Sequence, residues 1–96
     1  MAIAVTFDAV AAQAAVREAG AMVGRCYLHY EGYHYQVRDV AADASAGYVR
    51  VTYVSIDPGP KQGGKWSRPL SEWSTFVKWP DGITRPRYIL AERKTF

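Results

Sequence analysis

"GRCYLHYEGYHYQV", residues 24–37, places four tyrosines, two histidines and the chain's single cysteine around a glycine turn. A two-residue type I′ loop requires positive φ at both of its residues, and Glu31 is a poor choice for that conformation. A three-residue loop, Tyr30–Gly32, with Gly32 in the left-handed bulge position, fits the sequence better. The stretch therefore predicts a β-hairpin in which Tyr27 lies opposite Tyr35 and His29 lies opposite Tyr33.

This register gives the hairpin two faces, because side chains alternate along a strand. The face with the larger aromatic area is expected to point into the core, and it carries Tyr27, His29, Tyr33, Tyr35 and Val37. The other face carries Cys26, Leu28, His34 and Gln36. A slip of one residue would exchange the two faces. The tyrosines are therefore interpreted mainly as architecture, and His29 as a structural hydrogen-bonding group rather than a catalyst.

Length and composition indicate one folded domain. The chain has 96 residues, of which 49% are hydrophobic and 14% aromatic, enough for one modest core. A single cysteine excludes an intrachain disulfide and fits a reducing compartment. The alanine-rich start lacks the basic region of a signal peptide, and no run approaches the roughly 20 apolar residues that span a bilayer. We expect a cytoplasmic protein.

The remaining elements follow from periodicity and turn residues. Residues Phe7–Ala19 are predicted to form a helix that is capped by Thr6 or Asp8 and ended by Gly20 in the left-handed conformation. We expect its narrow apolar stripe to pack on its own domain rather than on a second copy. The stripe is Phe7, Val10, Ala11, Ala14 and Arg17.

Beyond Gly24, Tyr, Val and Thr become frequent and turn residues recur at short spacing, which predicts short antiparallel strands. A single helical turn is expected over Pro69–Trp73. The predicted fold is thus mainly β with an added N-terminal α-helix, residues 1–23 forming the helix and linker and residues 24–96 the β-domain. The expected strands are Arg25–His29, Tyr33–Ala41, Tyr48–Ile56, Lys65–Arg68, Thr75–Trp79 and Arg87–Leu90.

Three motifs resemble those of a family of small bacterial domains of unknown function, which show Y-x-H-Y-K-G-x-x-Y-x-V, then W-x-R-P-L-x-x-F, then P-R-F. Here the matching positions are Tyr27, His29, Tyr30, Gly32, Tyr35 and Val37, then Trp66, Arg68, Pro69, Leu70 and Trp73, then Pro86, Arg87 and Tyr88. The departures are Glu31 for Lys, Trp73 for Phe and Tyr88 for Phe. The resemblance implies an SH3-like antiparallel barrel of five to six short strands, and it supplies no activity.

Charge is distributed unevenly along the chain. Residues 1–60 hold four basic and six acidic side chains, a net charge of −2, whereas residues 61–96 hold eight basic and three acidic ones, a net charge of +5. A basic C-terminal third attracts nucleic acid or an acidic protein, and it is also compatible with an ordinary solvated surface.

The segment WSRPL offers the clearest candidate contact surface. Trp66 and Arg68 alternate with Ser67 and so share one face of a strand. Together with Trp73 they either form a groove that binds a partner, or they are structural, with Arg68 clamping the end of the loop. The candidate binding residues are Tyr30, Lys61, Lys65, Trp66, Arg68, Trp73 and Arg87.

These observations favour a non-enzymatic binding module that recognises a protein or peptide through aromatic and basic loop residues, including a phage- or plasmid-type inhibitor of a host complex. The alternative is a nucleic-acid-binding protein that uses the basic C-terminal third, with Trp66, Trp79 and Tyr88 stacking on bases. We expect no enzyme, no cofactor and no metal site. Cys26 and His29 fall on opposite strand faces, and no phosphate-binding glycine loop is present.

Overall fold

The turn at Tyr30–Gly32 forms as predicted in the computed structural model, which describes residues 9–91. The backbone N–H of His29 donates to the carbonyl oxygen of Tyr33 over 2.8 Å, and Gly32 has φ +100°. Tyr27 pairs with Tyr35 in the antiparallel ladder between the first two strands. The predicted hairpin register is therefore confirmed.

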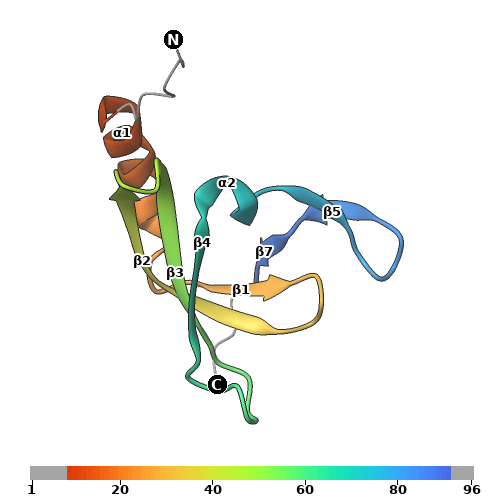
Figure 1. Ribbon diagram of the computed structural model, residues 1–96. Coiled ribbons are helices and arrows are strands. Elements are labelled where there is room, and N and C mark those ends of the chain that lie inside the picture. Colours follow the sequence, from red (N-terminus) through yellow and green to blue (C-terminus); the bar gives the residue numbers. More distant parts are fainter. Residues whose placement is uncertain (1–8, 92–96) are drawn as a thin grey trace.

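The described chain is built from short elements (Figure 1). Helix α1 spans Ala9–Ala19 and is followed by a 3₁₀ turn, Gly20–Met22. The strands are β1 Cys26–His29, β2 His34–Asp43, β3 Tyr48–Ser55, β4 Lys65–Pro69, β5 Phe76–Lys78, β6 Thr84–Pro86 and β7 Tyr88–Leu90, and helix α2, Leu70–Trp73, lies between β4 and β5.

Five strands form one antiparallel sheet in the order β4-β3-β2-β1-β7, and β5 pairs with β6 in a separate hairpin. The mainly β class with an added N-terminal helix is confirmed. The expected closure into a barrel is not found in the described part of the chain, because β4 and β7 are the two edges of the sheet and do not pair with each other. Figure 1 shows the β5–β6 hairpin projecting away from the sheet beyond α2.

The hairpin face chosen as the inner one carries the core, with one exception. Val37 is fully buried and His29 is buried, while Tyr27 and Tyr35 pack against the core from its margin. Tyr33 is 45% exposed, so its predicted burial is wrong. It precedes the first residue of β2, where the loop turns its ring toward the β3–β4 connection.

A β-bulge at Arg38 shifts the register between β2 and β3, and it lets Val37 and Val40 both point inward. The main core combines these side chains with others from β3, β7 and both helices. It consists of Ala19, Val37, Val40, Val51, Tyr53, Trp73 and Tyr88.

Helix α1 packs on its own domain, against β2 and β3, as expected. It does so with a different face from the predicted stripe: Ala12 and Ala19 are buried, whereas Val10 is 77% exposed. The predicted left-handed Gly20 is also wrong, because Gly20 continues into the 3₁₀ turn and Gly24 takes φ +85°. The proposed caps, Thr6 and Asp8, lie outside the described residues.

Within residues 9–91, neither helix has the length and hydropathy needed to cross a bilayer.

Candidate functional site

A polar hollow of about 130 Å³ opens on the inner face of the sheet, between the β1–β2 hairpin and β4. We call it the ring cavity, because four aromatic rings line it together with charged side chains. Its lining residues are His29, Glu31, Tyr35, Tyr53, Lys61, Trp66, Arg68 and Tyr88.

The strand register brings these side chains together. Residues directly opposite each other in an antiparallel pair share a face. Tyr53 lies opposite Trp66, and His29 lies opposite Tyr88. Tyr35 then fills the space between the two pairs, with its ring edge-on to Tyr53 at a centroid distance of 5.1 Å. Residues from five strands of one sheet therefore meet at a single hollow.

The hydroxyl of Tyr53 is the centre of a hydrogen-bond network beside the cavity. Arg68 Nε donates to it over 3.0 Å, and the Tyr88 hydroxyl lies 3.3 Å away. Arg68 also donates from Nη1 to Glu72 Oε1 over 3.3 Å. Burial, reinforced by the hydrogen bond to Tyr53, raises the pKa of Tyr88 well above its ordinary value. The Tyr88 hydroxyl thus stays protonated, and Arg68 is held in place by its bonds to Tyr53 and Glu72.

His29 is a buried side chain of the cavity, with 4% of its surface exposed. Its Nδ1 accepts a hydrogen bond from the backbone N–H of Glu31 over 3.2 Å. Burial lowers the pKa of His29; Glu31 opposes this, and Arg68 and Arg87 add to the lowering. A neutral imidazole that accepts at Nδ1 carries its proton on Nε2. That Nε2 is buried and has no hydrogen-bond partner among the described residues.

Trp66 forms the exposed wall of the cavity and is positioned by a glycine. Its side chain is 39% exposed and its ring stacks beside Tyr53 at a centroid distance of 6.3 Å. A Cβ atom built on Gly64 would come within 2.5 Å of the indole. The indole therefore lies directly on the Gly64 backbone. Any larger residue at position 64 would clash with the indole in this position.

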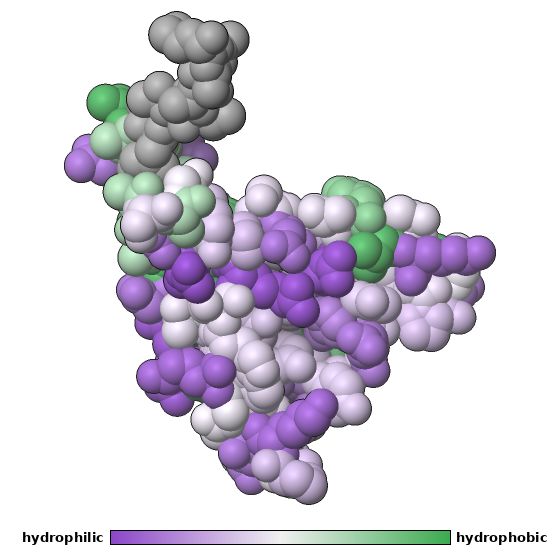
Figure 2. Space-filling view, viewed as in Figure 1, coloured by the Kyte–Doolittle hydropathy of each residue, from purple (hydrophilic) through white to green (hydrophobic). Residues whose placement is uncertain are grey.

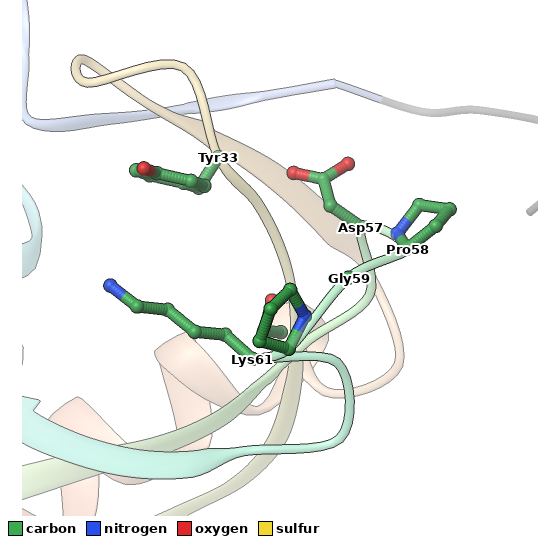
Figure 3. A pocket seen from close by; sticks show the side chains of 7 residues that line it. Tyr33, Asp57, Pro58, Gly59 and Lys61 are labelled. Carbon is green, nitrogen blue, oxygen red and sulfur yellow. The ribbon is translucent and has the colours of Figure 1, made fainter.

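A second hollow of about 190 Å³, here called the loop cavity, shares Lys61 with the ring cavity. It is lined by Tyr33, Ser55 and residues 57–61. Figure 3 shows the side chains that line the loop cavity. Lys61 reaches from the β3–β4 loop toward the Tyr33 ring, with Nζ 5.5 Å from the ring centroid. Asp57 anchors this loop, because its carboxylate accepts from the backbone N–H of His34 over 2.6 Å and lies 2.9 Å from His34 Nδ1.

Comparison with known proteins agrees with the motifs of the sequence. A family described as "Protein of unknown function (DUF1653)" matches residues 25–89, which is most of the chain. The chain belongs to the DUF1653 family. A search of the curated proteins found no match. A crystal structure of a DUF1653 protein from Bordetella bronchiseptica is similar to this chain with a TM-score of 0.61 and 25% sequence identity, over 75% of this chain and 90% of that one.

The DUF1653 domain brings three of the seven sequence-predicted binding residues to the ring cavity: Lys61, Trp66 and Arg68. Tyr30 and Arg87 lie next to it, since the Tyr30 ring packs against His29 and the Arg87 guanidinium lies 5.7 Å from the Tyr30 centroid.

The other two predicted residues lie elsewhere in this DUF1653 domain. Trp73 is in the core, 3% exposed, and supports Tyr88 from beneath rather than presenting a surface. Lys65 pairs with Val54 in the ladder next to the Tyr53–Trp66 pair, so it lies on the opposite sheet face from Trp66. The opposite orientation of Lys65 and Trp66 was predictable from the sequence, because consecutive residues of a strand point to opposite faces.

Four lining residues were not predicted as site residues from the sequence. They are the tyrosines of the cavity floor, Tyr35, Tyr53 and Tyr88, and the buried His29. The sequence pattern predicts a core position for them, because aromatic residues on a strand are usually part of the core. Within residues 9–91, no three histidine, cysteine or acidic side chains converge as metal ligands would.

Proposed function

We propose that this DUF1653 domain is a non-enzymatic binding module for an extended peptide segment of a protein partner. The observation that carries the proposal is the ring cavity itself, a concave site in which one exposed indole and two cations lie over a floor of packed tyrosines, two of them buried. Partly exposed aromatic and arginine side chains beside a packed floor are the typical anchors of protein recognition.

The position of the cavity suits a linear ligand. Trp66 and Arg68 stand on β4, an edge of the sheet, so a ligand reaches both without crossing another strand. The loop cavity continues the surface past Lys61 and presents Tyr33 and two prolines, Pro58 and Pro60. A peptide lying across both hollows would place one side chain in each.

The arrangement favours a peptide over nucleic acid. Of the three rings considered for base stacking, Trp79 and Tyr88 are buried and only Trp66 is accessible. Arg85 is paired with Asp81 over 2.7 Å, and Arg68 with Glu72 over 3.3 Å, so part of the basic charge is already neutralised locally. The further expectation that the partner belongs to a host complex stays a prediction.

The test is selection from a display library of random linear peptides, followed by measurement of affinities for the enriched sequences. Trp66→Ala is expected to weaken binding by about tenfold or more, whereas the control Phe76→Ala is expected to have no effect. Phe76 is an exposed aromatic residue on β5 and does not line either cavity. Figure 2 shows apolar surface in the region of the β5–β6 hairpin, away from both cavities. Failure to enrich any peptide, or equal losses in both variants, would refute the proposal. Salt-dependent binding of single-stranded DNA in place of peptides would favour the alternative.

A further inference from the structure

We infer that the ring cavity binds a carboxylate group of its ligand. The inference rests on the proposed function, since it names the chemical group by which a bound peptide is anchored. It follows from counting the hydrogen-bond donors and acceptors that line the cavity.

The two tyrosine hydroxyls leave one proton without an acceptor among residues 9–91. Tyr53 and Tyr88 share a single hydrogen bond of 3.3 Å, which uses one of their two protons whichever hydroxyl donates. Arg68 is a donor only, so its bond to Tyr53 Oη consumes no proton of the pair. One O–H at the floor of the cavity is therefore free to donate to a ligand.

His29 adds a second unused donor. Its Nδ1 already accepts from the Glu31 backbone, which assigns the imidazole proton to Nε2. That nitrogen is buried without a partner in the described part of the chain. A buried donor without an acceptor costs stability, and a bound oxygen atom would relieve that cost.

The charges around these donors select an anion. Lys61 and Arg68 line the cavity, and Glu31 is its only carboxylate among the described lining residues. The Glu31 side chain is 61% exposed at the hairpin tip. An aromatic cage for a cationic ligand would not contain a guanidinium, because like charges repel.

Charge and size favour a carboxylate over a phosphate. The Arg68 guanidinium is shared with Glu72, and Glu31 repels a dianion at the rim. A cavity of about 130 Å³ has room for a small planar group. A monovalent carboxylate matches two donors at the floor and the remaining N–H groups of the Arg68 guanidinium at the side, since Nε and Nη1 already donate to Tyr53 and Glu72.

The test uses small probes on the whole chain and does not require a known partner. N-acetylglycine mimics a chain terminus, N-acetylaspartic acid α-amide mimics an acidic side chain, and N-acetylglycinamide is the neutral control. Nuclear magnetic resonance follows the His29 imidazole and the Trp66 indole during each titration. We expect at least one carboxylate probe to give saturable shifts of both, and the amide to give none. The responding probe identifies the source of the carboxylate.

Arg68→Gln is expected to weaken the carboxylate response about tenfold or more, while Arg85→Gln, which changes an arginine outside the cavity, leaves it unchanged. Equal shifts with the amide, tighter binding of inorganic phosphate, or no shift with either carboxylate would overturn the inference. Peptides that are selected through Trp66 yet bind equally well after their carboxylates are amidated would also overturn it. In that case the proposed peptide-binding function would survive.

Discussion

The indole of Trp73 lies parallel to the ring of Tyr88, with centroids 3.7 Å apart and an interplanar angle of 3°. This stack joins helix α2 to strand β7 beneath the ring cavity. Tyr88 in turn presents its hydroxyl to Tyr53. The floor of the cavity is therefore part of the core, and its shape depends on core packing.

The two tryptophans nearest the cavity are expected to differ sharply in their contribution to stability. Trp73→Ala leaves a void under Tyr88 and is expected to lower the free energy of unfolding by about 3–5 kcal/mol. Trp66→Ala removes a partly exposed ring and is expected to cost about 1 kcal/mol or less. Urea denaturation measures both. Similar losses for the two variants would contradict the division into floor and wall.

The Tyr53 hydroxyl is expected to stabilise the network around it. Tyr53→Phe leaves Arg68 Nε and the Tyr88 hydroxyl without their shared acceptor, and the expected loss is about 1–3 kcal/mol. Tyr48→Phe is the matched control, because the Tyr48 hydroxyl accepts one bond from Arg50 Nη2 over 3.1 Å at a half-buried position. Thermal denaturation of the two variants should rank Tyr53→Phe as the less stable. The reverse order would show that the network contributes little.

The pH dependence of stability is expected to report on His29. Burial holds the pKa of His29 below 6.5 in the folded chain, with Glu31 opposing and Arg68 and Arg87 assisting. Below pH 6.5 the unfolded chain therefore binds a proton more readily than the folded one. Stability is then full above pH 6.5 and falls as the pH drops toward the lower folded pKa. His29→Gln should remove this slope in denaturation curves, while His34→Gln should keep it.

A slope that persists in His29→Gln would assign the titration to another group. Asp43 titrates at a lower pH than His29, so the two contributions can be told apart. Hydrogen bonds from the Ala46 N–H, the Ser45 hydroxyl and Arg50 lower the pKa of Asp43 to about 2. Its contribution is present above pH 3.8 and is lost only as the pH falls from there toward 2.

Gly64 is expected to control binding although it offers no side chain. In Gly64→Ala the new Cβ displaces the Trp66 indole, since the two would otherwise lie 2.5 Å apart. Affinity for selected peptides should fall about tenfold, with a shift in indole fluorescence. Gly20→Ala is the control, because nothing lies within 4 Å of its Cβ and its φ is not positive. Undiminished affinity in Gly64→Ala would show that the indole position is unimportant.

Local patterns predicted the fold well wherever one chain segment determines its own structure. The Gly32 turn and the alternation of Tyr27, Tyr35 and Val37 specify the first hairpin without reference to the rest of the chain. Strand β6 was not predicted, because three residues, Thr84–Pro86, ending in proline give no alternation to detect. Closure of the sheet would require the edge strands β4 and β7 to pair, and no local sequence pattern predicts whether they do.

The candidate site was predictable only in part for the same reason. The alternation of Trp66 and Arg68 indicated their shared face, and the structure places both at the ring cavity. Nothing in the sequence distinguishes the buried Trp73 from the accessible Trp66, because burial of Trp73 depends on β7 passing over α2. The Nε2 of His29, which has no partner within residues 9–91, likewise depends on packing between strands, with the centroid of the Tyr88 ring, from β7, 4.8 Å from that of the imidazole.

The most direct test of the account is to map a selected peptide onto the chain by nuclear magnetic resonance. Binding at the ring cavity predicts the largest shifts in the side-chain and backbone signals of His29, Tyr53, Lys61, Trp66 and Arg68, with smaller ones at Tyr33 in the loop cavity. Shifts that gather instead on the β5–β6 hairpin or on helix α1, with those five residues unchanged, would contradict it.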